Sequence, residues 1–241
     1  MSPKEEKEKP RLRGAAMLQY IWDYYKLRIL LVGICLYVVC YLAYRNVTAE
    51  YPQLYLAYVN LDVGETLNKG LTEGFISCLA PSEKNSVVKT LPGLALTESL
   101  QRIDTSYLYA SQMKILSAID SQRLDIVLMN QEAFDAFSQN GFLTDLTAFA
   151  ERYDLSALQP FFVENIEILT DNAAEVIVDP SAEYHSEVTS YPMAIDISEF
   201  PMIREAGLPD RVFLGIIANS PRTETAAAFV SYLSGSKVIV R

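Results

Sequence analysis

The chain has 241 residues, half of them hydrophobic, and a formal net charge of −10 at pH 7. A chain this acidic is a poor match for the phosphate backbone of nucleic acid, which excludes nucleic acid as a partner. The single histidine excludes a His-rich metal site, and only Cys78 of the three cysteines lies beyond the first apolar segment, so no disulfide can form within the rest of the chain.

That first apolar segment is residues 29–44, sixteen residues without a charge between two arginines. As a helix it rises roughly 24 Å, whereas a hydrocarbon core is about 30 Å thick. Lys26 and Arg28 can reach the membrane surface with their charged ends, and Trp22 suits the headgroup region, so the flanks make up the difference. We predict a transmembrane helix over residues 26–45. The alternatives are a buried core helix and a cleaved signal sequence.

The charges around this helix predict its orientation. Seven Lys/Arg precede the apolar run, which places residues 1–25 in the cytoplasm. Residues 1–13 are charged and lack apolar periodicity, as in a solvated tail, whereas residues 15–25 form either an interfacial helix or the first turns of the span. We therefore expect a single-pass protein of the cell membrane with an extracellular domain at residues 50–241. That domain holds 12 Lys/Arg and 26 Asp/Glu, a balance that also argues against anionic lipid as a partner.

The first half of the exterior domain alternates between two periodicities. Apolar runs typical of buried strands alternate with amphipathic helical patterns, and Asn130 is placed to cap the last of these helices. Cys78 falls near the apolar stripe of the first helix and is expected to be packed and inert. Such alternation predicts an α/β fold with a mainly parallel sheet and flanking helices. The predicted strands are 54–59, 87–91 and 124–129, and the helices are 65–79, 106–122 and 131–139.

The second half is less regular. We predict a helix at 147–153, leave 158–169 open, and predict strands at 175–178 and 212–218. A final helix is expected to start at Asn219-Ser220-Pro221, with Ser220 as its N-cap and the proline in the first helical position.

No pattern that carries catalytic chemistry occurs in the chain. G-x-S-x-G, the P-loop, G-x-G-x-x-G and EF-hand spacing are all missing. Asp179, Glu183, His185 and Glu187 lie close together, but without a glycine for a calcium-binding turn they are best explained as a solvated acidic loop. We therefore expect a protein that is not an enzyme and that has neither a metal nor a cofactor.

Two segments resemble a known family. Residues 117–146 run through a helix, the short strand Asp125-Ile-Val-Leu, a second helix and Gly141-Phe-Leu-Thr-Asp-Leu. Residues 213–233 read as a late apolar strand followed by a helix that opens with Asn-Ser. Together they resemble the extracellular solute-binding proteins of ABC transporters, which have the type 2 periplasmic-binding-like fold. The resemblance implies one complete lobe and, because the chain is short, a reduced second lobe at about 147–200. The membrane helix departs from the family.

In open α/β sheets, ligands bind beyond the carboxyl ends of the strands. If the three apolar runs at 54–59, 124–129 and 212–218 share one parallel sheet, their ends bring Asn60, Asn130 and Asn219 to one edge. Helix capping is the alternative role for Asn130 and Ser220. The candidate ligand-binding residues are Asn60, Asp62, Asn130, Gln131, Asn219 and Ser220, with Tyr191 and Asp196 from the reduced lobe.

Two functions follow from this interpretation. The first is a membrane-anchored extracellular binding module for a small polar solute or peptide, associated with an ABC transporter. The alternative is a non-enzymatic structural or regulatory envelope protein that has lost ligand binding and docks on a membrane partner through its acidic surface.

Overall fold

The computed structural model describes residues 15–79, 85–96, 105–179, 181–208 and 211–235. The predicted solvated tail at 1–13 lies outside the described residues. The chain divides into two compact units, 1–49 and 50–241, and we describe each by itself.

The first unit contains one long helix, α1 (Ala15–Thr48). Its segment Tyr24–Arg45, 22 residues, is long and apolar enough to cross a membrane and includes the predicted span. The described side chains of this segment are exposed. Residues 15–25 and the span belong to the same helical element.

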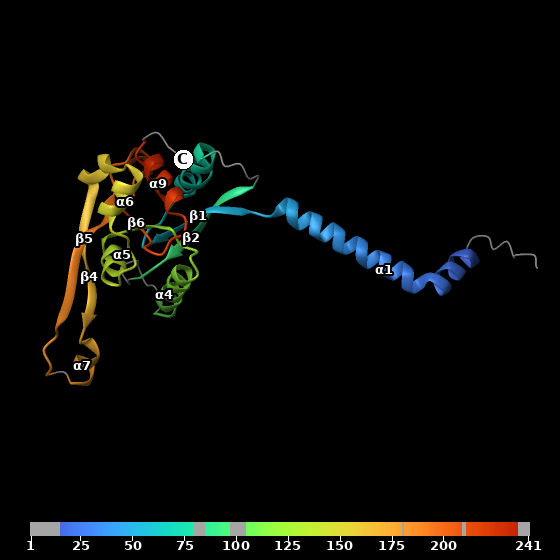
Figure 1. Cartoon of the computed structure of the whole chain (residues 1–241), viewed down its shortest axis with the longest axis horizontal. Coiled ribbons are helices and arrows are strands. Elements are labelled where there is room, and N and C mark those ends of the chain that lie inside the picture. The colour runs from blue at the N-terminus through green and yellow to red at the C-terminus, as the bar shows by residue number, and fades with distance from the viewer. Residues whose placement is uncertain (1–14, 80–84, 97–104, 180, 209–210, 236–241) are drawn as a thin grey trace, which may run out of the picture. The chain divides into compact units, whose positions relative to one another are not determined.

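The second unit is built on one six-stranded sheet, in the order β2-β1-β3-β6-β5-β4 (Figure 1). Strand β1 is parallel to both β2 and β3, whereas the β3–β6, β6–β5 and β5–β4 pairs are antiparallel. The strands are β1 (Tyr51–Val59), β2 (Ser86–Leu94), β3 (Ile126–Met129), β4 (Phe162–Asp171), β5 (Ser186–Asp196) and β6 (Phe213–Ile216).

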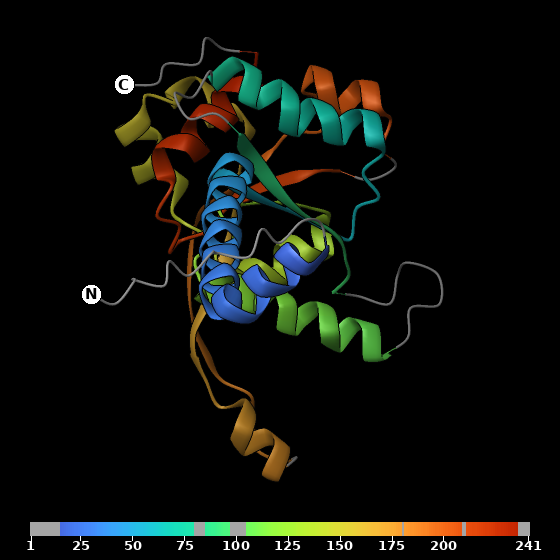
Figure 2. The ribbon, with the colours of Figure 1, turned by 90° about the vertical axis from the view of Figure 1, so that its right-hand side faces the viewer.

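Helices cover both faces of the sheet (Figure 2). Because side chains alternate along a strand, Leu54, Leu56 and Tyr58 of β1 enter one core while Ala57 and Val59 enter the other. The first core is covered by α2 (Glu65–Lys69), which continues through a π-helical turn into α3 (Phe75–Leu79), and by α6 (Leu146–Tyr153), α8 (Pro201–Ala206) and α9 (Thr223–Leu233). The second core is covered by α4 (Thr105–Asp120) and α5 (Gln131–Gln139).

The α/β class is confirmed, but the sheet is mixed and not mainly parallel. Strand β6 lies beside β3 in the same sheet, as its apolar run predicts, yet Phe213 pairs with Met129 and Ile216 with Ile126, so the two strands run in opposite directions. A central strand buried on both faces is a continuous apolar run whichever way it points. Its composition therefore predicts burial and leaves its direction open.

The segment 147–200 contributes to this same sheet. A 3₁₀ helix (Ser156–Phe161) follows α6, and then β4, α7 (Ala173–Val178) and β5 form a long hairpin. Ala194 to Asp196 of β5 pair with Gly215 to Phe213 of β6, so the segment has no separate sheet. The far part of the hairpin, residues 165–191, extends away from the sheet and is called the arm below (Figure 1).

Two local predictions are wrong. Residues 175–178 are helical, not extended: the backbone N–H groups of Glu175 and Val176 donate to the carbonyl of Asn172, and α7 pairs with no strand. Cys78 is exposed and not packed. The buried positions of its helix, Leu67, Leu71 and Phe75, are four residues apart, and Leu79 continues this spacing by packing on the first core, so Cys78 falls beside the stripe.

Candidate functional site

The carboxyl ends of β1 and β3 meet at one edge of the sheet. Asn60 and Asn130 follow the paired residues Val59 and Met129, and the Asn60 amide donates to Asn130 Oδ1 at 3.2 Å. Asn60 is 2% exposed, has a left-handed backbone (φ 54°) and accepts from the Leu96 N–H through its Oδ1 at 2.9 Å. Asn130 Oδ1 also accepts from the Ala133 N–H at 3.1 Å and so caps α5. These amides hold the edge together, and the capping role predicted as an alternative for Asn130 is confirmed.

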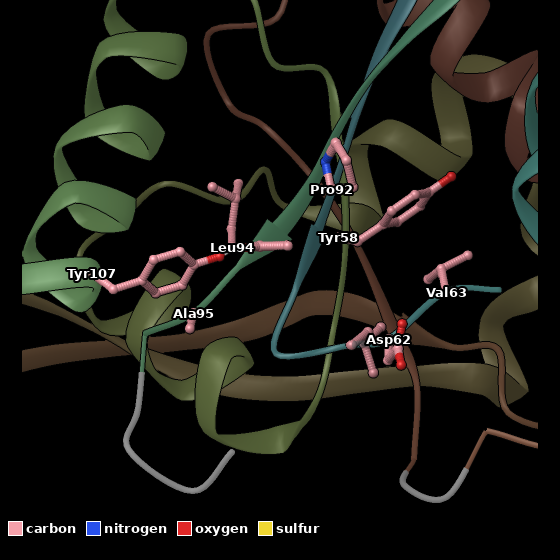
Figure 3. Close-up of a pocket in the computed structure, with 9 residues that line it drawn as sticks. Tyr58, Asp62, Val63, Pro92, Leu94, Ala95 and Tyr107 are labelled. Carbon is pink, nitrogen blue, oxygen red and sulfur yellow. Dashed lines mark hydrogen bonds between the residues drawn. The ribbon is translucent and has the colours of Figure 1, made fainter. Parts of the chain in front are cut away.

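A small hollow of about 220 Å³ lies beside this edge, lined by Asp62 and apolar groups of β1, β2 and the loops that follow them (Figure 3). Two tyrosines lie on opposite sides of the end of β2. The Tyr58 hydroxyl donates to Asn68 Oδ1 at 2.8 Å, burial raises the pKa of this phenol, and the Tyr107 hydroxyl donates to the carbonyl of Gly93. A pocket for a small ligand usually measures about 300–1,000 Å³, so this hollow is small for that purpose.

Two other candidates, Gln131 and Asp196, are engaged by side chains of this chain. Gln131 is exposed, and its amide donates to Asp135 Oδ1 at 2.9 Å within α5. Asp196 lies at the same edge as Asn130, because β5 is antiparallel to β6 and therefore points the same way as β3. Burial acts to raise the Asp196 pKa, but hydrogen bonds from Ser198 and Arg211 outweigh it and hold that pKa below its usual value.

Tyr191 lies at the base of the arm, away from the predicted edge. Its hydroxyl donates to the Glu167 carboxylate on the neighbouring strand β4. Burial, followed by the hydrogen bond and charge of Glu167, raises the pKa of Tyr191 to about 12. The phenol is therefore engaged by a carboxylate and is not placed as a stacking face beside Asn60 or Asn130.

The prediction that Asn219 joins Asn60 and Asn130 is wrong. Because β6 runs antiparallel, its end lies at the opposite edge, where Asn219 donates to the Ile119 carbonyl at 2.8 Å. Ser220 is not an N-cap either, since α9 begins at Thr223. Its hydroxyl donates instead to Asp125 Oδ1 at 2.7 Å.

This opposite edge contains a cluster that the sequence interpretation missed. Asp125 is fully buried and accepts from the Tyr55 N–H at 2.7 Å, from Ser220, and from Arg222 Nε at 2.9 Å. The Arg222 guanidinium also lies over the Tyr55 ring, 4.6 Å from its centre, and donates to the Gln122 carbonyl. The available signal was an acidic residue directly before a buried strand, which requires a partner. With its donors in place, Asp125 joins β1, β3 and the start of α9.

The arm carries a different kind of surface. Helix α7 buries none of its residues, and Ile177 and Val178 are 81% and 86% exposed. Leu169 and Val188 add exposed apolar surface along the strands. The end of the arm is nevertheless ordered, because the Asn172 side chain donates to the Glu183 carbonyl and accepts from the His185 N–H, at 2.9 and 2.7 Å.

Apart from His185, the ionisable side chains of the arm are all acidic. Residues 165–191 include six Asp/Glu and no Lys or Arg. Ile177 and Val178, both more than four-fifths exposed, place aliphatic surface at the tip of the hairpin. The arm is therefore acidic along its length and apolar at its tip.

The described residues form an α/β protein with a mixed six-stranded sheet and a projecting acidic arm, and one helix among them is apolar enough to cross a membrane. No protein-family model matches the chain, and no curated protein matches it.

Proposed function

We propose that the protein is a membrane-anchored, non-enzymatic envelope protein that docks on a partner protein through its arm. The observation that carries the proposal is the exposure of Ile177 and Val178 at the tip of an arm that has no Lys or Arg. Fully burying aliphatic side chains of this size contributes roughly 1.5–3 kcal/mol each, so a partner that covers both adds this free energy to the stability of the complex.

The chemistry of the arm specifies the partner. Six carboxylates without a counter-ion of their own favour a surface that presents Lys or Arg, and the aliphatic tip requires an apolar pocket between them. An anionic lipid surface would be repelled by the same charges. We therefore propose a protein with a basic-rimmed apolar pocket, in the membrane or beside it, as the occupant.

Solute binding is less well supported by the same geometry. The edge amides Asn60 and Asn130 bond to each other and to the backbone, and the neighbouring hollow is small. The proposed resemblance to one lobe of the type 2 periplasmic-binding-like fold is supported by the return of β6 to the sheet of β1 and β3. The segment proposed as a second lobe adds strands to this same sheet, and its middle part, residues 165–191, forms the arm. We therefore favour docking over ligand binding.

Site-specific photocrosslinking in living cells tests this function. A photoreactive amino acid at Ile177 of the full chain should give one adduct of defined mass, and the same group at Tyr109, an exposed position on α4, should not. With the photoreactive group moved to Leu169, the double substitution Ile177→Ser/Val178→Ser should abolish the adduct. Because α7 buries nothing, the melting temperature should stay unchanged.

The outcomes separate the alternatives. The crosslinked peptide of the partner should carry Lys or Arg beside apolar residues. An adduct that persists in the double variant, or that forms equally at Tyr109, would reject docking through the arm. An adduct between two copies of this chain would replace the proposed partner by self-association.

A further inference from the structure

A second surface has the opposite charge to the rest of the domain. Strand β2, helix α4 and the turn between α4 and β3 surround an open groove of about 460 Å³, within the usual size range of ligand sites. Three cationic side chains line it: Lys89, Lys114 and Arg123. They are three of only 12 Lys/Arg in residues 50–241, and its lining residues in the described part of the chain include no Asp or Glu. None of these elements belongs to the arm.

Two of the three cations are available to a ligand. Lys89 is paired with Glu50, and its side chain is 44% exposed. Lys114 and Arg123 are exposed, and within the described part of the chain neither side chain has an ion-pair partner. An unpaired lysine and arginine in one concavity leave donors and positive charge for an anion.

Hydroxyl groups complete the donor set. Thr90 and Ser117 line the groove beside the cations, so neutral donors stand next to charged ones. Ser121 also lines the groove, but its hydroxyl donates to the Ser117 carbonyl at 2.6 Å and is not counted as a donor. Tyr55 also lines the groove; its backbone N–H donates to buried Asp125, and the Arg222 guanidinium lies over its ring. The Asp125 charge is itself engaged by Arg222, so it does not cancel the charge of the groove.

We infer that this groove binds a phosphate-bearing ligand. A phosphate group is anionic near neutral pH, whether as a monoester or as the diester of a lipid headgroup, and it has several acceptor oxygens. These match two available cations, a third paired one and two hydroxyls. The groove is larger than a phosphate ion, which leaves room for the rest of a phosphorylated solute or of a lipid headgroup. The ligand chemistry is the same for both sources, and only an experiment separates them.

The test uses the full chain in nanodiscs of phosphatidylcholine. Inorganic phosphate and glycerol 3-phosphate are titrated, and protection of Lys114 from an amine-reactive label is followed by mass spectrometry, with Lys69 on α2 as the internal reference. In a second arm, phosphatidylglycerol replaces part of the lipid and no soluble phosphate is added. Saturable protection in the first arm identifies a solute, and protection confined to the second identifies a headgroup.

Matched variants decide whether the groove is responsible. In Arg123→Gln the affinity should fall about tenfold or more, because one charge-assisted hydrogen bond is lost, and Arg204→Gln on α8, outside the groove, should leave it unchanged. Both side chains are exposed, so the melting temperature should not move. Absence of saturable protection in both arms, or equal affinity of Arg123→Gln and the unsubstituted chain, would overturn the inference.

Discussion

Asp125 is the only charged side chain among the described residues that is fully buried. Its donors come from β1 and from the loop before α9, 70 to 97 residues away along the chain. A buried carboxylate is tolerated when it is paired and hydrogen-bonded, and removing one partner of such a pair leaves the other uncompensated. The cluster therefore fixes the edge at which β1 and β3 begin.

We predict that Asp125→Ala lowers the free energy of unfolding of residues 50–241 by about 3–5 kcal/mol, measured by urea denaturation. Three donors lose their acceptor, and Arg222 keeps a charge that is only 24% exposed. Asp120→Ala, at the exposed end of α4, should change the value by no more than about 0.5 kcal/mol. Equal effects of the two substitutions would show that the cluster is not a structural anchor.

Asn130, Asn219 and Asp125 show which side-chain roles can be predicted from the sequence. Asn130 was correctly predicted as a cap because the helix it caps starts at the next residue, so the whole interaction is local. Asn219 was placed at the wrong edge because its position depends on the direction of β6, which composition leaves open. Asp125 was recognised only as part of a family-like motif, since its partners lie far away along the chain.

At the scale of elements, β6 is the strand on which the two halves of the sheet meet. It joins β3 of the parallel half to β5 of the arm hairpin, and all four of its residues are buried. Gly215 faces Val127 of β3 and Ala194 of β5. A Cβ there would lie 2.7 Å from Leu143 Cδ2 and 2.8 Å from Met129 Cε, so the neighbouring side chains approach the backbone closely because the residue is glycine.

We predict that Gly215→Ala destabilises the domain by about 1–3 kcal/mol, the usual cost of inserting a methyl group into a filled core. The matched control is Gly64→Ala, where an added Cβ meets nothing within 4 Å and φ is −60°. That control should stay within about 0.5 kcal/mol of the unsubstituted domain. If thermal and urea unfolding of Gly215→Ala matched the control, the packing of Leu143 and Met129 over β6 would be looser than described.

The hairpin of β4, α7 and β5 pairs with β6 at its base. The secondary structure of its base and that of its tip differ from the sequence prediction in different ways. The base of β5 is an apolar stretch that pairs with β6, and sequence reasoning did not identify it as a strand. Residues 175–178 have the β-branched composition of a strand, yet they form α7 at the tip, where no neighbouring strand offers hydrogen bonds. Strand composition describes a fit to a half-buried pleated surface, and the tip of the arm has no such surface.

For the molecule as a whole, charge separates the regions before and after the apolar helix. Seven Lys/Arg precede the apolar run, whereas residues 50–241 hold 26 Asp/Glu against 12 Lys/Arg. This asymmetry follows the positive-inside rule, and we propose that the domain with the arm and the groove is exterior. Exposed Cys78 on α3 provides a direct way to test this, because the other two cysteines, Cys35 and Cys40, lie within the apolar segment of α1.

We predict that a membrane-impermeant thiol reagent labels the full chain in intact cells without denaturant, at Cys78. The exposed thiol is accessible in the folded domain, and Cys35 and Cys40 should be shielded by lipid. Cys78→Ser should abolish the labelling, and Cys35→Ser/Cys40→Ser should leave it unchanged. Labelling is read by mass shift on a gel, with a cytoplasmic protein of the same cells as the control for leakage. Labelling of Cys78 only after the cells are broken would place residues 50–241 in the cytoplasm and reverse the orientation.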